Sequence, residues 1–235
     1  MLLSEIIMQT LRCLEKFILY IIPCVVILLI LYKLCRVPKF IFRKCLHVVA
    51  FSCVTVMIVF GESWIAAVLA SVVIIIVVYP LLSAAEHIKG YADLFVQKSP
   101  GEVKRSLVML FGMFAVLTAV SWGIFNTPEA GAAAILMWGI GDAAAALIGI
   151  PFGKHKVSLA DGHKSYEGSL AMLLFSSLFG FLFLYLHSGL SPATAAAASI
   201  SGAAAGTLTE LFSASEYDTV TVPAAILTVL LIIVL

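Results

Sequence analysis

The chain has 235 residues, of which 63% are hydrophobic and only 11% are charged. Soluble domains contain roughly 45–50% apolar and about 25% charged residues, so this chain has too little polar surface to coat a water-soluble globule. Its formal net charge of +1 argues against a nucleic-acid-binding protein, which needs a surplus of basic charge to neutralise phosphates. The composition is that of a polytopic membrane protein.

Apolar runs recur along the whole chain. A helix needs about 20 predominantly apolar residues to cross the hydrocarbon core of a bilayer. Charged, proline-rich or glycine-rich breaks separate eight candidate runs, at residues 14–33, 45–60, 63–82, 106–125, 130–151, 169–187, 192–212 and 219–235. The second and the last are short. We therefore expect an all-α protein with about eight transmembrane helices in a single transmembrane domain over residues 1–235.

Basic residues are distributed unevenly over the loops between these runs. Loops one, three and five contain 12 of the 14 Lys and Arg residues, whereas loops two, four and six contain none. The positive-inside rule assigns the basic loops to the cytoplasm. Nearly all reactive polar side chains fall on the same side, so we expect a multi-pass protein with a cytoplasmic active site. The short loops favour a prokaryotic plasma membrane.

The third loop has a helical pattern of its own. Within Ser83–Gln97, the apolar residues Ile88, Tyr91, Ala92 and Phe95 recur at the spacing of one helix face. Charged residues surround them. The pattern predicts a short amphipathic helix on the cytoplasmic surface of the membrane.

Asp142 is the one carboxylate well inside an apolar run. A charged Asp near the membrane centre costs at least about 2.5–3.5 kcal/mol on insertion scales, so it needs a partner. Ionisable residues within a membrane are functional candidates by default. The alternative is that Asp142 only hydrogen-bonds a neighbouring helix.

Glycines surround Asp142, and a basic loop follows it. Small residues let a ligand or another backbone approach closely, although plain helix packing has the same requirement. Pro151 and Gly153 are expected to end the helix. The loop then presents Lys154, His155, Lys156, His163 and Lys164. Lysines beside a carboxylate suit a metal-bound polyphosphate, with Asp for Mg²⁺ and Lys for phosphate oxygens. Backbone N–H groups at the next helix start would add an anion site; ordinary membrane anchoring is the alternative for the lysines.

Two further clusters face the same side. Arg43 and His47 share a helix face at i, i+4 spacing, and Lys44 lies beside them. Membrane anchoring explains the two basic residues but not the histidine. Near the end of the chain, Glu210 and Asp218 flank the junction of the last two runs together with Glu216. Glu210 is the candidate second acid of a metal site, whereas Glu216 is also compatible with a solvated loop.

In chain order, four motifs resemble the family of CTP-dependent lipid kinases, which includes dolichol or polyprenol kinase, phytol kinase and the CTP-dependent diacylglycerol kinases. The motifs are Arg43-Lys44-x-x-His47; Gly141-Asp142 leading to Gly149 and Phe152-Gly153; Lys164-Ser165-x-Glu167-Gly168-Ser169; and Glu210 with Asp218 before Thr221-Val222-Pro223. They define a lipid-kinase-like core over about residues 43–223, preceded by the N-terminal span 14–33. Two positions differ from the usual pattern: Ala146 stands where Ser is common, and Thr219 follows Asp218 where Asn is common.

The resemblance implies a membrane-embedded enzyme that transfers the γ-phosphate of CTP to the hydroxyl of a lipid alcohol. It implies Mg²⁺ or another divalent cation as cofactor. The expected catalytic residues are Asp142, Lys164, Arg43, Lys44 and His47. The expected nucleotide-binding residues are Gly141, Gly149, Gly153, Lys154, Lys164, Ser165, Glu167 and Gly168. The expected metal ligands are Asp142, Glu210 and Asp218. The Lys164 motif leans towards a polyprenol substrate, with diacylglycerol or phytol next.

Two other classes of protein remain as alternatives. A phosphatidate cytidylyltransferase would use the same nucleotide and metal but make a CDP-lipid, although the long Asp-rich signature expected of such enzymes near the C-terminus is not present. An ion- or proton-coupled transporter would use intramembrane acids along a pathway. That alternative expects polar residues on both faces, whereas the outer loops are nearly bare. The sequence leaves the oligomeric state open.

Overall fold

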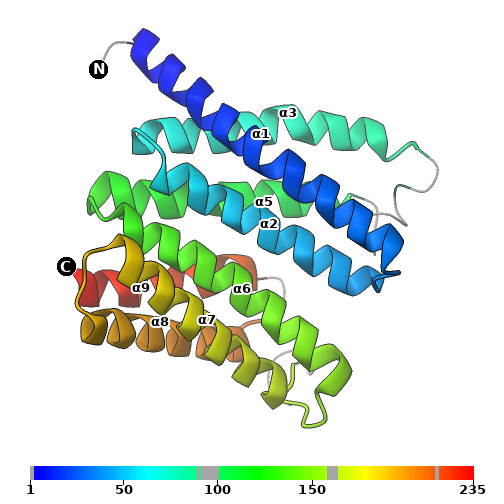
Figure 1. Cartoon of the computed structure of the whole chain (residues 1–235), viewed down its shortest axis with the longest axis vertical. Helices are drawn as coiled ribbons and strands as arrows, with labels where there is room; N and C mark the ends of the chain where they lie inside the picture. Colours follow the sequence, from blue (N-terminus) through cyan, green and yellow to red (C-terminus); the bar gives the residue numbers. More distant parts are fainter. Residues whose placement is uncertain (1–2, 89–90, 92–100, 158–163, 215–216) are drawn as a thin grey trace. The chain divides into compact units, whose positions relative to one another are not determined.

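The computed structural model describes residues 3–88, 91, 101–157, 164–214 and 217–235 (Figure 1). Within this part of the chain the structure is all-α, as the sequence predicts. Contacts divide the chain into two compact units, Met1–Ala119 and Val120–Leu235. Both units are built from apolar helices, so the division does not contradict a single transmembrane domain. That domain over residues 1–235 stays a prediction.

The first unit is held together by large aromatic side chains. Its helices are α1 (Leu3–Leu34), α2 (Lys39–Val59), α3 (Trp64–Ala85) and α5 (Glu102–Thr118). In this unit α1 packs against α2 and α3, and α3 lies beside α5. The Phe111 ring meets the rings of Phe17 and Phe114 edge to face, with centroids 6.0 and 5.4 Å apart. Phe51 meets Phe114 in the same way at 5.3 Å. These contacts form the core of the unit.

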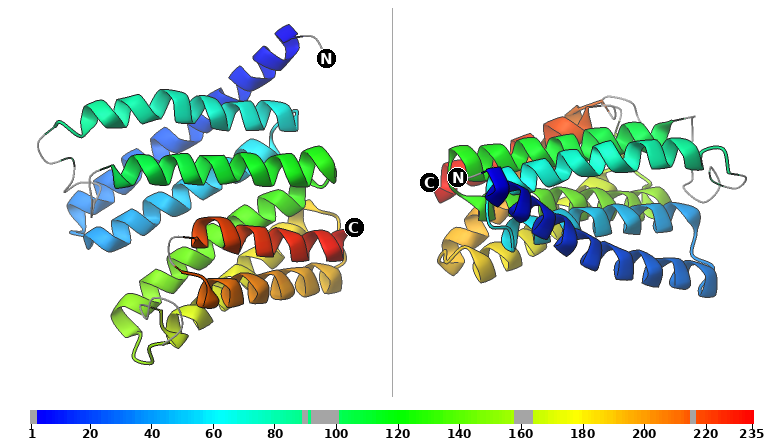
Figure 2. Two further views of the ribbon diagram at one scale, coloured as in Figure 1. Left: turned by 180° about the vertical axis from the view of Figure 1, so that it is seen from behind. Right: turned by 90° about the horizontal axis from the view of Figure 1, so that it is seen from above.

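The second unit is a bundle with a core of small residues. A π-helical segment, Ala119–Ile124, continues α5 and is followed by α6 (Pro128–Phe152), α7 (Tyr166–His187), α8 (Pro192–Phe212) and α9 (Asp218–Val234). Neighbours along the chain pack together, and α6 also packs against α9. Figure 2 shows α8 and α9 side by side. Much of the buried surface of α6 is alanine and glycine, which lets the helices approach closely.

Serine caps explain where three helices begin. The side chains of Ser63, Ser165 and Ser191 accept hydrogen bonds from backbone N–H groups in the first turns of α3, α7 and α8. Such caps satisfy donors that have no partner within the helix. Pro192 at the start of α8 adds a residue whose fixed φ suits the first helical position. Consequently α8 occupies the predicted range 192–212, and α7 begins three residues before the predicted 169.

Within the described part of the chain, six helices are long and apolar enough to cross a membrane. They are α1, α2, α3, α5 with its π-helical extension to Ile124, α6 and α7. The helix α9 is apolar but has only 17 residues, and α8 is not among the six. The chain is therefore an integral membrane protein.

The helix α1 begins well before the predicted residue 14. Its 32 residues extend about 48 Å at 1.5 Å per residue, which exceeds the ~30 Å hydrocarbon core. The early part contains Arg12, which precedes the predicted run, and Lys16, which lies within it. Arg12 donates hydrogen bonds to both carboxylate oxygens of Glu62, at 2.7 and 2.6 Å, and Lys16 donates to the Phe60 carbonyl at 2.6 Å. The contact with Arg12 lowers the pKa of the Glu62 carboxyl, so this pair stays ionised at neutral pH.

The predicted amphipathic helix Ser83–Gln97 lies largely outside the described residues. The described part shows that α3 continues to Ala85. Glu86 follows it and pairs with the Lys104 ammonium at 2.7 Å. The amphipathic helix remains a prediction.

We expect Gly206→Ala to lower the stability of the second unit by about 1–3 kcal/mol, the usual cost of overpacking a tight core. A Cβ atom at Gly206 would lie 2.7 Å from side-chain atoms of Ile226 on α9. Gly112→Ala is the matched control, because a Cβ atom there would lie within 4 Å of no described residue other than its chain neighbours and the nearby backbone of its own helix. Thermal unfolding of the purified protein, followed by circular dichroism, compares the two. A Gly206→Ala variant that melts at or above the wild-type temperature would contradict the close α8–α9 packing.

Candidate functional site

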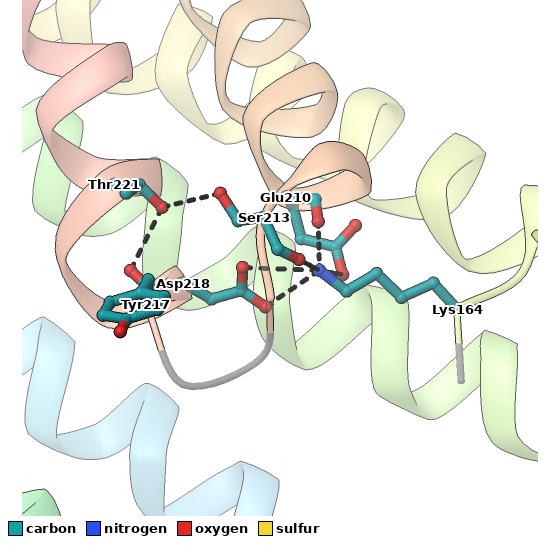
Figure 3. A network of polar contacts seen from close by, with 6 residues as sticks. All are labelled: Lys164, Glu210, Ser213, Tyr217, Asp218 and Thr221. Carbon is teal, nitrogen blue, oxygen red and sulfur yellow. Dashed lines mark hydrogen bonds and ion pairs between the residues drawn. The ribbon is translucent and has the colours of Figure 1, made fainter. Parts of the chain in front are cut away.

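Lys164 is the centre of a polar cluster in the second unit (Figure 3). Its ammonium donates hydrogen bonds to the backbone carbonyls of Glu210 and Ser213, the latter at 2.8 Å. It also lies 3.0 Å from Asp218 Oδ2 and 3.6 Å from Glu210 Oε1. The Lys164 side chain is only 8% exposed. A buried cation needs such partners, because an uncompensated charge in a low-dielectric interior is costly.

An antiparallel β-bridge places Lys164 in this position. The bridge joins Lys156 to Ser165. Beside it, Val157 N–H donates to the Lys164 carbonyl at 2.9 Å, and Tyr166 N–H donates to the His155 carbonyl at 3.0 Å. The segment after α6 therefore folds back along the segment before α7, and this contact directs Lys164 towards the junction of α8 and α9.

Hydrogen bonds also stabilise the acidic side of the cluster. The Ser213 hydroxyl, just after α8, lies 3.0 Å from the Thr221 hydroxyl on α9. Thr221 in turn donates to the Tyr217 carbonyl at 3.1 Å. Figure 3 shows these contacts beside Asp218, at the start of α9. They fix the end of α8 against the first turn of α9, which carries the acid.

Asp142 on α6 belongs to the same neighbourhood. Its carboxylate interacts electrostatically with that of Glu210, as does the carboxylate of Asp218. The Lys164 charge opposes this repulsion. The structure thus brings together three predicted site residues, Lys164, Glu210 and Asp218, from two separate motifs, and Asp142 of a third motif acts on them electrostatically.

The chemistry of the oxygen atoms around Lys164 fits a divalent cation. Carboxylate and carbonyl oxygens are the ligands that Mg²⁺ prefers. Among the described residues, no three His, Cys, Asp or Glu side chains converge closely enough to hold a metal ion. The Lys164 ammonium instead lies among these oxygens. These oxygens are of the type expected for the predicted metal ligands, and the Lys164 ammonium lies at their centre.

The glycines near Asp142 are sites of close packing. Those with close neighbours on α7 or in the segment before it are Gly141, Gly149, Gly153 and Gly168. A Cβ atom at Gly141 would collide with the Ser176 hydroxyl, and one at Gly153 would lie 2.5 Å from the Ser165 hydroxyl. These contacts match the packing alternative that the sequence left open. The predicted nucleotide contacts of the four glycines remain a prediction.

The start of α7 is already engaged by protein groups. Ser165 caps the helix by accepting from Gly168 N–H at 3.2 Å, and Tyr166 N–H donates to His155. The Glu167 carboxylate accepts from the His155 backbone N–H at 3.2 Å and lies 2.7 Å from the ring nitrogen Nδ1. An anion at the start of α7 would therefore meet the Glu167 carboxylate. Lys164 and the exposed Lys154 lie nearby and suit phosphate better than these backbone N–H groups do. The His155–Glu167 contact was not predicted, because a 12-residue separation across a loop has no periodic signal.

The remaining predicted site residues belong to the first unit or lie outside the described residues. Arg43, Lys44 and His47 are on α2 in the first unit. There Arg43 Nη1 lies 3.6 Å from Glu102 Oε1, a partner that the sequence did not indicate. Their predicted catalytic roles remain predictions. His163 and Glu216 lie outside the described residues.

A comparison of the chain with protein-family models, curated proteins and solved structures found no match. The resemblance to CTP-dependent lipid kinases therefore depends on the four sequence motifs. The contact of Lys164 with Glu210 and Asp218 is a separate observation, because it comes from the fold.

We expect Lys164→Met to destabilise the protein by about 3–5 kcal/mol, since it leaves the partly buried carboxylates of Glu210 and Asp218 without their cation. Lys156→Met is the matched control, because that side chain is exposed. Thermal unfolding in detergent measures both. The double variant Lys164→Met/Asp218→Asn should lose less stability than the sum of the losses in the two single variants, as expected for interacting residues. Wild-type stability of Lys164→Met would show that the cluster does not stabilise the bundle.

Proposed function

We propose that this protein is a membrane-embedded kinase that transfers the γ-phosphate of CTP to the hydroxyl of a lipid alcohol. A polyprenol or dolichol is the first candidate acceptor, and diacylglycerol or phytol comes next. The observation that carries the proposal is the meeting of Lys164 with Glu210 and Asp218, with Asp142 acting electrostatically on Glu210. A cation and several acids in one place are what phosphoryl transfer requires, since its catalysis consists mainly of positioning and charge stabilisation.

The proposal includes a topology. In it, α8 and α9 complete a set of about eight transmembrane helices together with the six long apolar helices. The cluster around Lys164 then faces the cytoplasm, where CTP is available and where the positive-inside rule assigns the basic loops. A prokaryotic plasma membrane is the proposed location.

Each residue of the cluster has a proposed role. Asp142, Glu210 and Asp218 would hold Mg²⁺, which supplies positive charge next to the β and γ phosphates. Lys164 and Lys154 bind phosphate oxygens, and Lys164 exchanges its carboxylate partners for them. A strong base is not required, because the transition state is largely dissociative. A carboxylate or His47 accepts the proton of the lipid hydroxyl.

A labelled-nucleotide assay tests this function. The purified protein is incubated with γ-labelled CTP, Mg²⁺ and, separately, a polyprenol, phytol or diacylglycerol, and label is followed into the lipid phase. We expect label in one of these lipids. Release of pyrophosphate with phosphatidate as the substrate would instead show a cytidylyltransferase. The absence of both products would overturn the proposal and leave the transporter class.

We expect Asp142→Asn to reduce turnover by at least about 100-fold, the usual effect of removing one group that stabilises charge in a transition state. The change preserves the size of the side chain but removes its charge. Lys156→Ala is the control, because Lys156 is exposed and is not one of the residues assigned here to bind metal or phosphate. Thermal unfolding must show that both variants fold. Full turnover in folded Asp142→Asn would remove the centre of the proposal.

A further inference from the structure

The first unit contains a cavity of about 510 Å³. Residues of α1, α2, α3 and α5 line it, so it lies within this unit. Most of its wall is aliphatic or aromatic, and includes Phe17, Phe42, Ile74, Leu107 and Phe111. Ligand sites in proteins are usually cavities of roughly 300–1,000 Å³ with apolar walls and a few polar groups. The cavity has the size and lining of such a site.

Two charged groups of the wall meet at the starts of two helices. Arg43, in the second turn of α2, lies 3.6 Å from Glu102, the first residue of α5. His47, one turn further along α2, also lines the cavity, as does Leu82 near the end of α3. The rest of the lining is almost entirely apolar. The cavity therefore has one polar end and one apolar end, like a lipid with a head and a tail.

Arg43 has an unsatisfied donor at this polar end. Its Nη1 is 3.6 Å from Glu102 Oε1, but its Nε is buried and has no hydrogen-bond partner among the described residues. A buried donor left unpaired costs about 1–3 kcal/mol, so such groups normally have an acceptor. An oxygen atom of a bound molecule beside the Arg43 side chain would provide one.

The shape and chemistry of the cavity select the occupant. Water and ions are disfavoured along apolar walls, which leave engineered cavities of this kind dry and able to bind apolar molecules. A transmembrane helix is about 10–12 Å wide, which is too wide to enter a cavity of this volume over more than a short length. A flexible hydrocarbon chain fits better, and the surrounding bilayer supplies such chains.

We propose that this cavity binds the apolar chain of a lipid whose oxygen-bearing head, an alcohol or its phosphate monoester, accepts a hydrogen bond from Arg43. The binding itself does not depend on the proposed function. Only the identification of this lipid as the phosphate acceptor rests on it.

Photolabelling without nucleotide tests the binding. The full-length protein in phosphatidylcholine nanodiscs is exposed to a long-chain alcohol, and separately to its phosphate monoester, each with a diazirine in the tail. Labelled peptides are mapped by mass spectrometry. We expect saturable labelling of residues 42–50 and 103–111, which contain cavity-lining positions of α2 and α5. Labelling that is not reduced by an excess of the unlabelled lipid would overturn the proposal.

A matched pair of variants on α5 locates the site. Leu107→Trp places a large side chain in the cavity and should reduce labelling at least tenfold. Met109→Trp is the control, because Met109 is 45% exposed and does not line the cavity. Leu110→Trp replaces Leu107→Trp if the latter does not fold. Equal labelling of the filled and control variants would overturn the proposal.

Arg43→Gln tests the head contact. If the variant loses more affinity, relative to wild type, for the phosphate probe than for the alcohol probe, the bound head is a phosphate. An equal loss of affinity for the two probes assigns an alcohol. Unchanged binding of both probes would overturn the contact with Arg43. Because the assay contains no CTP, failure of kinase activity and failure of lipid binding are observed separately.

Discussion

The second unit depends on the neutralisation of one buried cation. Lys164 lies just before an apolar helix, and its ammonium is surrounded by carbonyls and carboxylates from the junction of α8 and α9. A buried charge of this kind is tolerated only with close partners. The partners come from residues 46 to 54 positions further along the chain. The ion pair therefore joins the start of α7 to the α8–α9 junction, and the chemistry proposed for the site uses the same charges.

The helix positions were largely predictable from the sequence, because apolar runs and their breaks are local features. The observed helices differ from the predicted apolar runs at several ends. At the first run, α1 extends past Lys16 and Arg12 to Leu3, and Glu62 and the Phe60 carbonyl bind the charges of these two residues. The helix α7 starts earlier than predicted because Ser165 caps it, which is a local signal. The Glu62 and Phe60 partners, in contrast, cannot be identified from the spacing of residues within one helix.

The candidate site was predicted as a set of residues rather than as an arrangement. Asp142 was indicated by the cost of a carboxylate in an apolar run, and Lys164 by its basic loop. The bridge between Lys156 and Ser165 brings the loop back along itself. This bridge allows Lys164 to bind the carboxylates of Glu210 and Asp218. Such pairing across a loop has no periodic signal. The glycines show the same limit of sequence-based prediction. A bound ligand and a neighbouring helix both require small side chains, so the sequence does not distinguish them. The fold shows that the neighbours of these glycines include Ser165 and Ser176.

The two units differ in a way that follows from side-chain size. Alanine and glycine cover the buried faces of α6 and α8, so α6 packs closely against α7, and α8 against α7 and α9. In the first unit, the contacts are made by phenylalanines whose rings meet edge to face. Rigid rings do not fill every space between four helices, and a cavity remains beside Phe17, Phe42 and Phe111. Small residues thus favour a compact polar site in one unit, while large residues leave an apolar cavity in the other.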